Sequence, residues 1–181
     1  MTPIFLLVIG IVLVWGAVTY NRLVALRNRI DNAWAQIDVQ LRRRHDLIPN
    51  LVDTVEGYVG HERGTLEGVV EARRAALDAA DPSRRAEAEG LLSTALGRLF
   101  ALAEDYPDLR ASENFAALQE ELGDTEDKIA VARQIYNDTA LRYNTACQQV
   151  PTSLIASLFG FRPRPYFETD AATRAAPDVE F

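Results

Sequence analysis

The chain has 181 residues, a formal net charge of −7 and 48% hydrophobic residues. This length suits one domain plus an anchor, with enough chain to bury a core. The acidic balance argues against a nucleic-acid binder, which needs a basic face to neutralise phosphates. The lone cysteine, Cys147, has no intramolecular disulfide partner, and its helical pattern predicts a small buried apolar residue.

The N-terminal segment predicts a membrane anchor. Residues 3–18 carry no charge, and with Thr19 and Tyr20 the run reaches about the minimum spanning length of roughly 17–25 residues. Trp15 and Tyr20 lie near one end, where amphipathic rings favour the membrane interface. The alternative is a cleaved signal peptide, but a basic n-region and a small-x-small cleavage site are missing. We therefore expect an uncleaved transmembrane helix over residues 1–20.

The flanking cations predict the orientation of this anchor. Arg22, Arg27 and Arg29 follow the apolar run, whereas no cation precedes it. The positive-inside rule then places the N-terminus outside and the helical domain in the cytoplasm. We expect a single-pass protein of the bacterial cytoplasmic membrane.

Apolar residues then recur at steps of three and four, which indicates a helix with one buried stripe. The stripe consists of Leu23, Leu26, Ile30, Ala33, Ile37 and Leu41. Pro49 interrupts it, because proline lacks an N–H and clashes with the preceding turn. A break there predicts four helices at about 21–48, 50–80, 82–105 and 112–150. A kink predicts a long bent hairpin instead, and both alternatives return Val150 to the membrane side.

Later boundaries have their own signals. Asp81 and Pro82 suit the cap and first turn of a helix, and Ser112 can cap the last one. The stripe of that last helix, from Phe115 to Val150, alternates steps of three and four, which favours helix–helix packing. No strand-like alternation of useful length occurs, so the predicted class is all-α. We expect a helical domain over 21–150, an apolar segment at 151–167 and a disordered tail at 168–181.

Four blocks of the sequence resemble the LemA family. They are YNRLVALRNRIDNAWAQIDVQLRRRHDLIPNLVDTVEGYVGHE at 20–62, YPDLRASENFAALQEEL at 106–122, ARQIYNDTALRYNT at 132–145 and ASLFGFRPRPYF at 156–167. The resemblance implies one membrane anchor followed by an up-and-down four-helix bundle with long helices, and so favours a break at Pro49. It implies no reaction, because the family as a whole has no established catalytic residues.

The residue pattern contains no constellation typical of catalysis or cofactor binding. The two histidines, His45 and His61, do not match the HExxH spacing, and no cysteine cluster accompanies them. A nucleophile motif and a phosphate loop are also missing. We therefore expect no enzyme, no cofactor and no metal site.

Three successive arginines, Arg42, Arg43 and Arg44, form the most charged spot in the chain. Arg43 lies about 30 Å along a helix from the anchor, well beyond a Debye length of about 8 Å, so headgroup contact is not expected. One alternative is pairing with acids of the last helix, where Glu120, Glu121, Glu126 and Asp127 lie at similar heights. The other alternative is a docking site for a protein partner.

The apolar C-terminal segment predicts a second membrane contact, because both chain paths return it to the bilayer. The predicted contact residues are Leu154, Ile155, Leu158, Phe159, Phe161, Arg162, Arg164, Tyr166 and Phe167. The alternative is a hydrophobic cap on the open end of the bundle.

These features favour a binding protein rather than a catalyst. The leading hypothesis is a membrane-anchored helical scaffold or adaptor of the bacterial cell envelope, acting by protein binding and self-association. Its expected partners are membrane lipid, further copies of the chain and an envelope protein that the sequence does not identify. The alternative is a membrane-shaping protein that acts directly on lipid.

Overall fold

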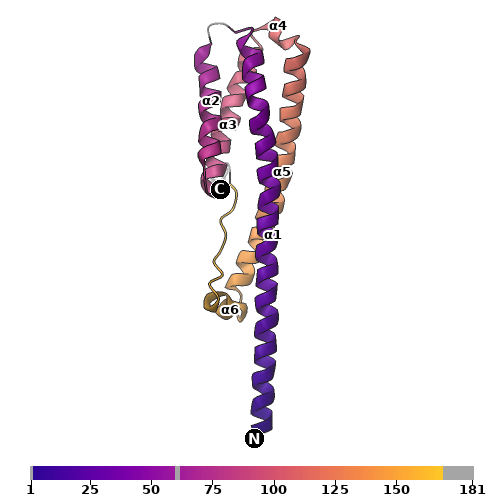
Figure 1. Cartoon of the computed structure of the whole chain (residues 1–181), viewed down its shortest axis with the longest axis vertical. Coiled ribbons are helices and arrows are strands. Elements are labelled where there is room, and N and C mark those ends of the chain that lie inside the picture. Colours follow the sequence, from indigo (N-terminus) through magenta and orange to yellow (C-terminus); the bar gives the residue numbers. More distant parts are fainter. Residues whose placement is uncertain (1, 60–61, 169–181) are drawn as a thin grey trace, which may run out of the picture. The chain divides into compact units, whose positions relative to one another are not determined.

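In the computed structural model, residues 2–59 and 62–168 are described, and this part of the chain is helical without any β-strand. The all-α class is therefore confirmed. The helices are α1 (Thr2–Glu56), α2 (Arg63–Asp78), α3 (Pro82–Ala103), α4 (Pro107–Arg110), α5 (Glu113–Gln148) and α6 (Thr152–Leu158), as Figure 1 shows. Residues 161–168 follow without regular secondary structure. Apart from Glu168, the predicted disordered tail lies outside the described residues.

The chain divides into two compact units. Unit 1 comprises residues 1–37 and 132–165, and unit 2 comprises residues 38–131 and 166–181. Helices α1 and α5 contribute to both units, whereas α2, α3 and α4 belong to unit 2 and α6 to unit 1.

Unit 2 has a continuous apolar core. Helices α2 and α3 lie side by side in it, and the short α4 leads from α3 into α5 (Figure 1). The buried side chains of this core include Leu92, Leu96 and Leu99 of α3 and Leu51 of α1. Removing these side chains from water is the main stabilising term of such a unit.

The predicted start of α3 is confirmed in detail. The Asp81 side chain accepts hydrogen bonds from the backbone N–H groups of Ser83 (3.1 Å) and Arg84 (3.0 Å). Pro82 occupies the first helical position, where its missing N–H costs nothing. Asp81 therefore satisfies two N–H groups that the helix itself leaves without acceptors.

Helix α1 does not end at Pro49 but continues to Glu56. The segment expected to be one helix over 50–80 is instead divided between the end of α1 and α2, which begins at Arg63. Pro49 has no N–H to donate to the carbonyl of His45 one turn earlier. Arg73 of α2 fills this gap, because its Nε donates a 2.8 Å hydrogen bond to the His45 carbonyl oxygen. A side chain from another helix thus compensates for the proline.

Unit 1 pairs the first part of α1 with the last part of α5. Trp34 and Tyr136 meet edge to face with ring centroids 5.6 Å apart, a favourable aromatic geometry. Burial raises the pKa of Tyr143 to about 12, and its hydrogen bond to Cys147 adds to the rise. Burial also raises the pKa of the Cys147 thiol, which is buried as the sequence predicted. A protonated, buried thiol is a packing residue rather than an activated nucleophile.

We predict that Arg73→Ala lowers the free energy of unfolding by about 1–3 kcal/mol, because the His45 carbonyl loses its donor. The matched control is Arg74→Ala, whose side chain is 85% exposed and whose loss should change stability by less than about 0.5 kcal/mol. Chemical denaturation followed by circular dichroism measures both.

A double-mutant cycle that combines Arg73→Ala with Pro49→Ala tests whether Arg73 compensates for the proline. Alanine at position 49 restores a backbone donor, so Arg73→Ala should cost less in that background. An unchanged cost, or equal losses for Arg73→Ala and Arg74→Ala, would contradict the compensation.

Candidate membrane interface

The first turns of α1 expose a continuous apolar surface. Among the described residues, α1 is the one helix long and apolar enough to cross a membrane. Its large apolar side chains are 40% (Ile9) to 71% (Ile4) exposed between residues 4 and 13. A helix that packs in a protein core would bury such side chains, so this surface fits membrane anchoring.

Helix α6 packs against α1 at the end of this apolar segment. The Ile155 Cδ1 atom lies 3.8 Å from the position that a Cβ on Gly16 would occupy, so the helices approach closely there. The Tyr20 ring meets Phe159 and Phe161 edge to face, with centroid separations of 4.9 Å and 5.6 Å. These contacts fix α6 beside the stretch from Gly16 to Tyr20.

One face of α6 and its flanks remains apolar and exposed. Leu154 (67% exposed) and Leu158 (76%) are four residues apart in α6, so they lie along one face of this helix, and Val150 (85%), which precedes α6, is also exposed. Phe159 adds to this face and is 55% exposed. We call these four residues the α6 apolar face. It belongs to a helix that contacts α1 at the end of the apolar segment.

The segment after α6 returns along α5 and is fixed by hydrogen bonds. The Asn144 side chain donates to the Arg164 carbonyl oxygen (2.9 Å) and accepts from the Arg164 N–H (2.8 Å). The Tyr136 hydroxyl donates to the Pro165 carbonyl oxygen at 2.9 Å. The Arg164 guanidinium also pairs with Asp31 at 3.2 Å. Backbone groups that lack a helical partner are thus satisfied by buried side chains of α5.

The nine predicted membrane-contact residues differ in exposure. Leu154, Leu158, Phe159 and Arg162 are exposed, and Ile155 and Tyr166 are partly buried. Phe161 (8% exposed) and Phe167 (1%) are buried instead, so these two side chains do not face lipid in this conformation. The Phe161 ring lies between Tyr20 and the Arg27 guanidinium, whose carbon is 5.4 Å from the ring centroid. Arg164 is exposed but engaged with Asp31.

The three successive arginines of unit 2 are all paired within that unit. Arg42 pairs with Asp38 on the same helix, and Arg43 pairs with Glu121 of α5 at 2.7 Å. The Arg43–Glu121 contact is of the kind expected if these arginines pair with acidic residues of the last helix. A docking role for the arginines stays a prediction.

Arg44 and His45 form a buried ionic cluster with α3 and α5. The Arg44 side chain, 6% exposed, lies 3.0 Å from a Glu126 oxygen and 3.7 Å from a Glu89 oxygen. His45 Nε2 lies 2.8 Å from the other Glu89 oxygen, and both side chains are buried. Glu89 therefore joins two cationic or ionisable groups away from water, where pairing offsets the cost of desolvation.

Glu89 was not among the residues predicted from the sequence to form a site, although its position carries a signal. Glu89 precedes Leu92, Leu96 and Leu99 at steps of three and four, so it occupies a core position of the α3 stripe. A carboxylate at such a position indicates a buried ion pair. The partners on α1 were not identifiable from this pattern.

The predicted absence of a metal site concerns His45 and His61. His61 lies outside the described residues, and His45 pairs with Glu89. Within residues 2–59 and 62–168, no group of three or more histidine, cysteine, aspartate or glutamate side chains is arranged to hold a metal ion.

We predict that Glu89→Gln lowers the free energy of unfolding by about 3–5 kcal/mol, because Arg44 and His45 lose their shared carboxylate. Glu87→Gln is the matched control on an exposed position of the same helix, with an expected change below about 0.5 kcal/mol. Urea denaturation measures both, and equal changes would rule out a special role for the buried carboxylate.

Comparison with known proteins places these features in a family context. The sequence model of the LemA family matches residues 33–181. Magnetosome protein MamQ of Magnetospirillum gryphiswaldense is 35% identical over 85 residues, which is 47% of this chain and 31% of MamQ. Protein LemA of Metamycoplasma hominis is 28% identical over 153 residues, covering 84% of this chain and 70% of that protein. This chain thus covers less than a third of the length of MamQ.

Proposed function

The chain belongs to the LemA family, and from this premise we propose that it is a membrane-anchored helical scaffold or adaptor of the bacterial cell envelope. In this proposal the first turns of α1 span the cytoplasmic membrane with the N-terminus outside. In unit 2 the rest of α1 forms an up-and-down four-helix bundle with α2, α3 and α5, and this bundle binds proteins on the cytoplasmic side.

The continuity of α1 is the observation that carries this proposal. The helix runs from the exposed apolar segment through Pro49 to Glu56 without an interruption. A protein bound along α1 would therefore be tethered to the bilayer through a continuous helix rather than a flexible linker.

The α6 apolar face supports a second membrane contact. Residues 3–20 extend about 27 Å as a helix, close to the roughly 30 Å of the hydrocarbon core. Helix α6 contacts α1 between Gly16 and Tyr20 and would therefore lie at the cytoplasmic interface. Burying Leu154, Leu158 and Phe159 in the bilayer surface would favour this position.

The same face favours the second candidate, a membrane-shaping protein. An apolar helix inserted in one leaflet displaces lipid headgroups, and its binding is sensitive to curvature. Stronger binding to small vesicles than to large ones would favour membrane shaping, whereas a dedicated protein partner would favour the scaffold.

We predict that a nitroxide at position 158 enters the bilayer. The label is attached to Leu158→Cys in a Cys147→Ala background of the full-length chain, reconstituted in lipid nanodiscs. The α6 apolar face should make it more accessible to oxygen than to a water-soluble nickel chelate. Val39→Cys, on an equally apolar and 60% exposed position of α1 in unit 2, is the control and should show the reverse. If the label were more accessible to the nickel chelate than to oxygen at both positions, the result would contradict the second membrane contact.

We also predict that the full-length chain forms an oligomer of defined size in detergent, as self-association requires. Mass photometry of this chain beside a version that begins at Tyr20 measures the state of each. An oligomer formed only by the full-length chain would assign assembly to the anchor. Monomers in both samples would contradict self-association.

A further inference from the structure

Charge is distributed unevenly along this acidic chain. Unit 1, residues 1–37 and 132–165, contains seven arginines and only two acidic residues, Asp31 and Asp138. Its formal net charge is therefore +5, although that of the whole chain is −7. The part of the protein that carries the anchor is thus the basic part, and it complements an anionic membrane surface.

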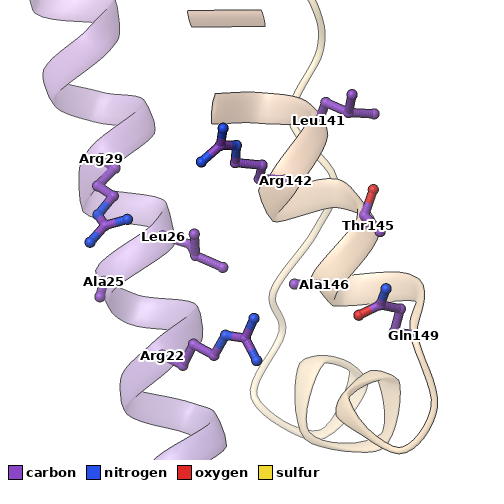
Figure 2. Close-up of a pocket in the computed structure, with 9 residues that line it drawn as sticks. All are labelled: Arg22, Ala25, Leu26, Arg29, Leu141, Arg142, Thr145, Ala146 and Gln149. Atoms are coloured by element: carbon purple, nitrogen blue, oxygen red, sulfur yellow. The ribbon is translucent and has the colours of Figure 1, made fainter. Parts of the chain in front are cut away.

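Three of these arginines surround a cleft between α1 and α5 (Figure 2). The cleft has a volume of about 580 Å³, which lies within the range of about 300–1,000 Å³ typical of small-ligand sites. Arg22 and Leu26 of α1 point toward α5, and Arg142 of α5 points back toward α1. Arg29, Ala25, Leu141, Thr145, Ala146 and Gln149 complete the lining.

The cleft arginines have no acidic partner within residues 2–59 and 62–168. Among the described residues, no carboxylate lies within ion-pair distance of Arg22, Arg29 or Arg142. In the same unit, Arg27 lies over the Phe161 ring and Arg164 pairs with Asp31. Three unpaired guanidinium groups around one cleft leave a positive site that an anion would neutralise.

The position of the cleft along α1 indicates which kind of anion would bind there. Arg22 lies about 3 Å beyond Tyr20 along the helix axis, and Arg29 about 14 Å beyond it. The headgroup layer on each side of a bilayer is roughly 5–8 Å thick. The lower part of the cleft therefore lies at headgroup depth, and the long Arg29 side chain can extend back toward it.

We propose that this cleft binds the phosphate group of an acidic phospholipid such as phosphatidylglycerol. Arginine suits this ligand because its planar guanidinium forms paired hydrogen bonds with phosphate oxygens. Leu26 and Leu141 offer apolar contact to the glycerol and upper acyl chain, while Thr145 and Gln149 offer neutral hydrogen-bonding groups. The inference rests on the proposed anchoring of α1 and adds the lipid class that the anchored protein prefers.

The test uses the full-length chain in detergent micelles, titrated with phosphatidylglycerol or phosphatidylcholine of the same acyl composition. Native mass spectrometry measures the bound lipid. We expect phosphatidylglycerol to bind at least tenfold more tightly. Arg142→Gln should weaken it about fivefold, the effect of one arginine near an anionic surface, and leave phosphatidylcholine binding unchanged. Arg22→Gln should have the same effect from the opposite helix.

Arg27→Gln is the matched control, because Arg27 is exposed, belongs to the same helix and unit as Arg22 and does not line the cleft. It removes the same charge and should change affinity less than twofold. Equal losses for Arg142→Gln and Arg27→Gln would overturn the site in favour of diffuse attraction. Equal affinity for the two lipids would overturn it as well.

Two further measurements separate the remaining outcomes. Inorganic phosphate at millimolar concentration should not displace phosphatidylglycerol, and displacement would assign the cleft to a soluble phosphate instead. Extraction of membranes with alkaline carbonate tests the anchor alone. A protein released by carbonate would refute the anchoring itself, whereas a retained protein without lipid preference would refute only the cleft.

Discussion

The hydrogen bond from Arg73 to the His45 carbonyl replaces the donor that Pro49 removes from α1, and it joins α1 to α2 within unit 2. Proline in a helix interior normally costs about 3 kcal/mol, in part because one carbonyl loses its donor. Here the donor comes from α2. The hydrogen bond lost at Pro49 and the packing of α2 against α1 are therefore linked, so the contributions of Pro49 and Arg73 to stability are not independent.

The part of α1 around His45 also forms polar side-chain contacts with α3 and α5, the other long helices of unit 2. His45 meets Glu89 of α3, and Arg44 meets both Glu89 and Glu126 of α5. Apolar burial is non-directional, so a core of leucine and alanine allows several helix registers. Buried ion pairs have stricter geometry, and we interpret the Arg44–Glu89 cluster as a feature that restricts register at some cost in stability.

Hydrophobic periodicity predicted the helices and their buried stripes because it reports local geometry. The residue types Asp81 and Pro82 located the cap of α3, since the cap and the N–H groups that donate to it are adjacent in sequence. The choice between a break and a kink at Pro49 was beyond the reach of local signals, because the compensating Arg73 lies 28 residues from His45. For the membrane interface, composition identified the right segment but did not distinguish buried Phe161 from exposed Phe159. That distinction depends on Tyr20 and Arg27, which come from the other end of the chain.

The contacts of unit 1 join the two ends of the chain, and this has a consequence for biosynthesis. Asp31 and Arg164 are separated by 133 positions, and α5 lies almost entirely between them. At about 5–20 residues per second, the ribosome needs on the order of ten seconds to supply the second partner after the first. During that interval Tyr20 and Arg27 have left the ribosome without Phe161. The packing of unit 1 can therefore be completed only after residues 38–131 of unit 2 have been synthesised.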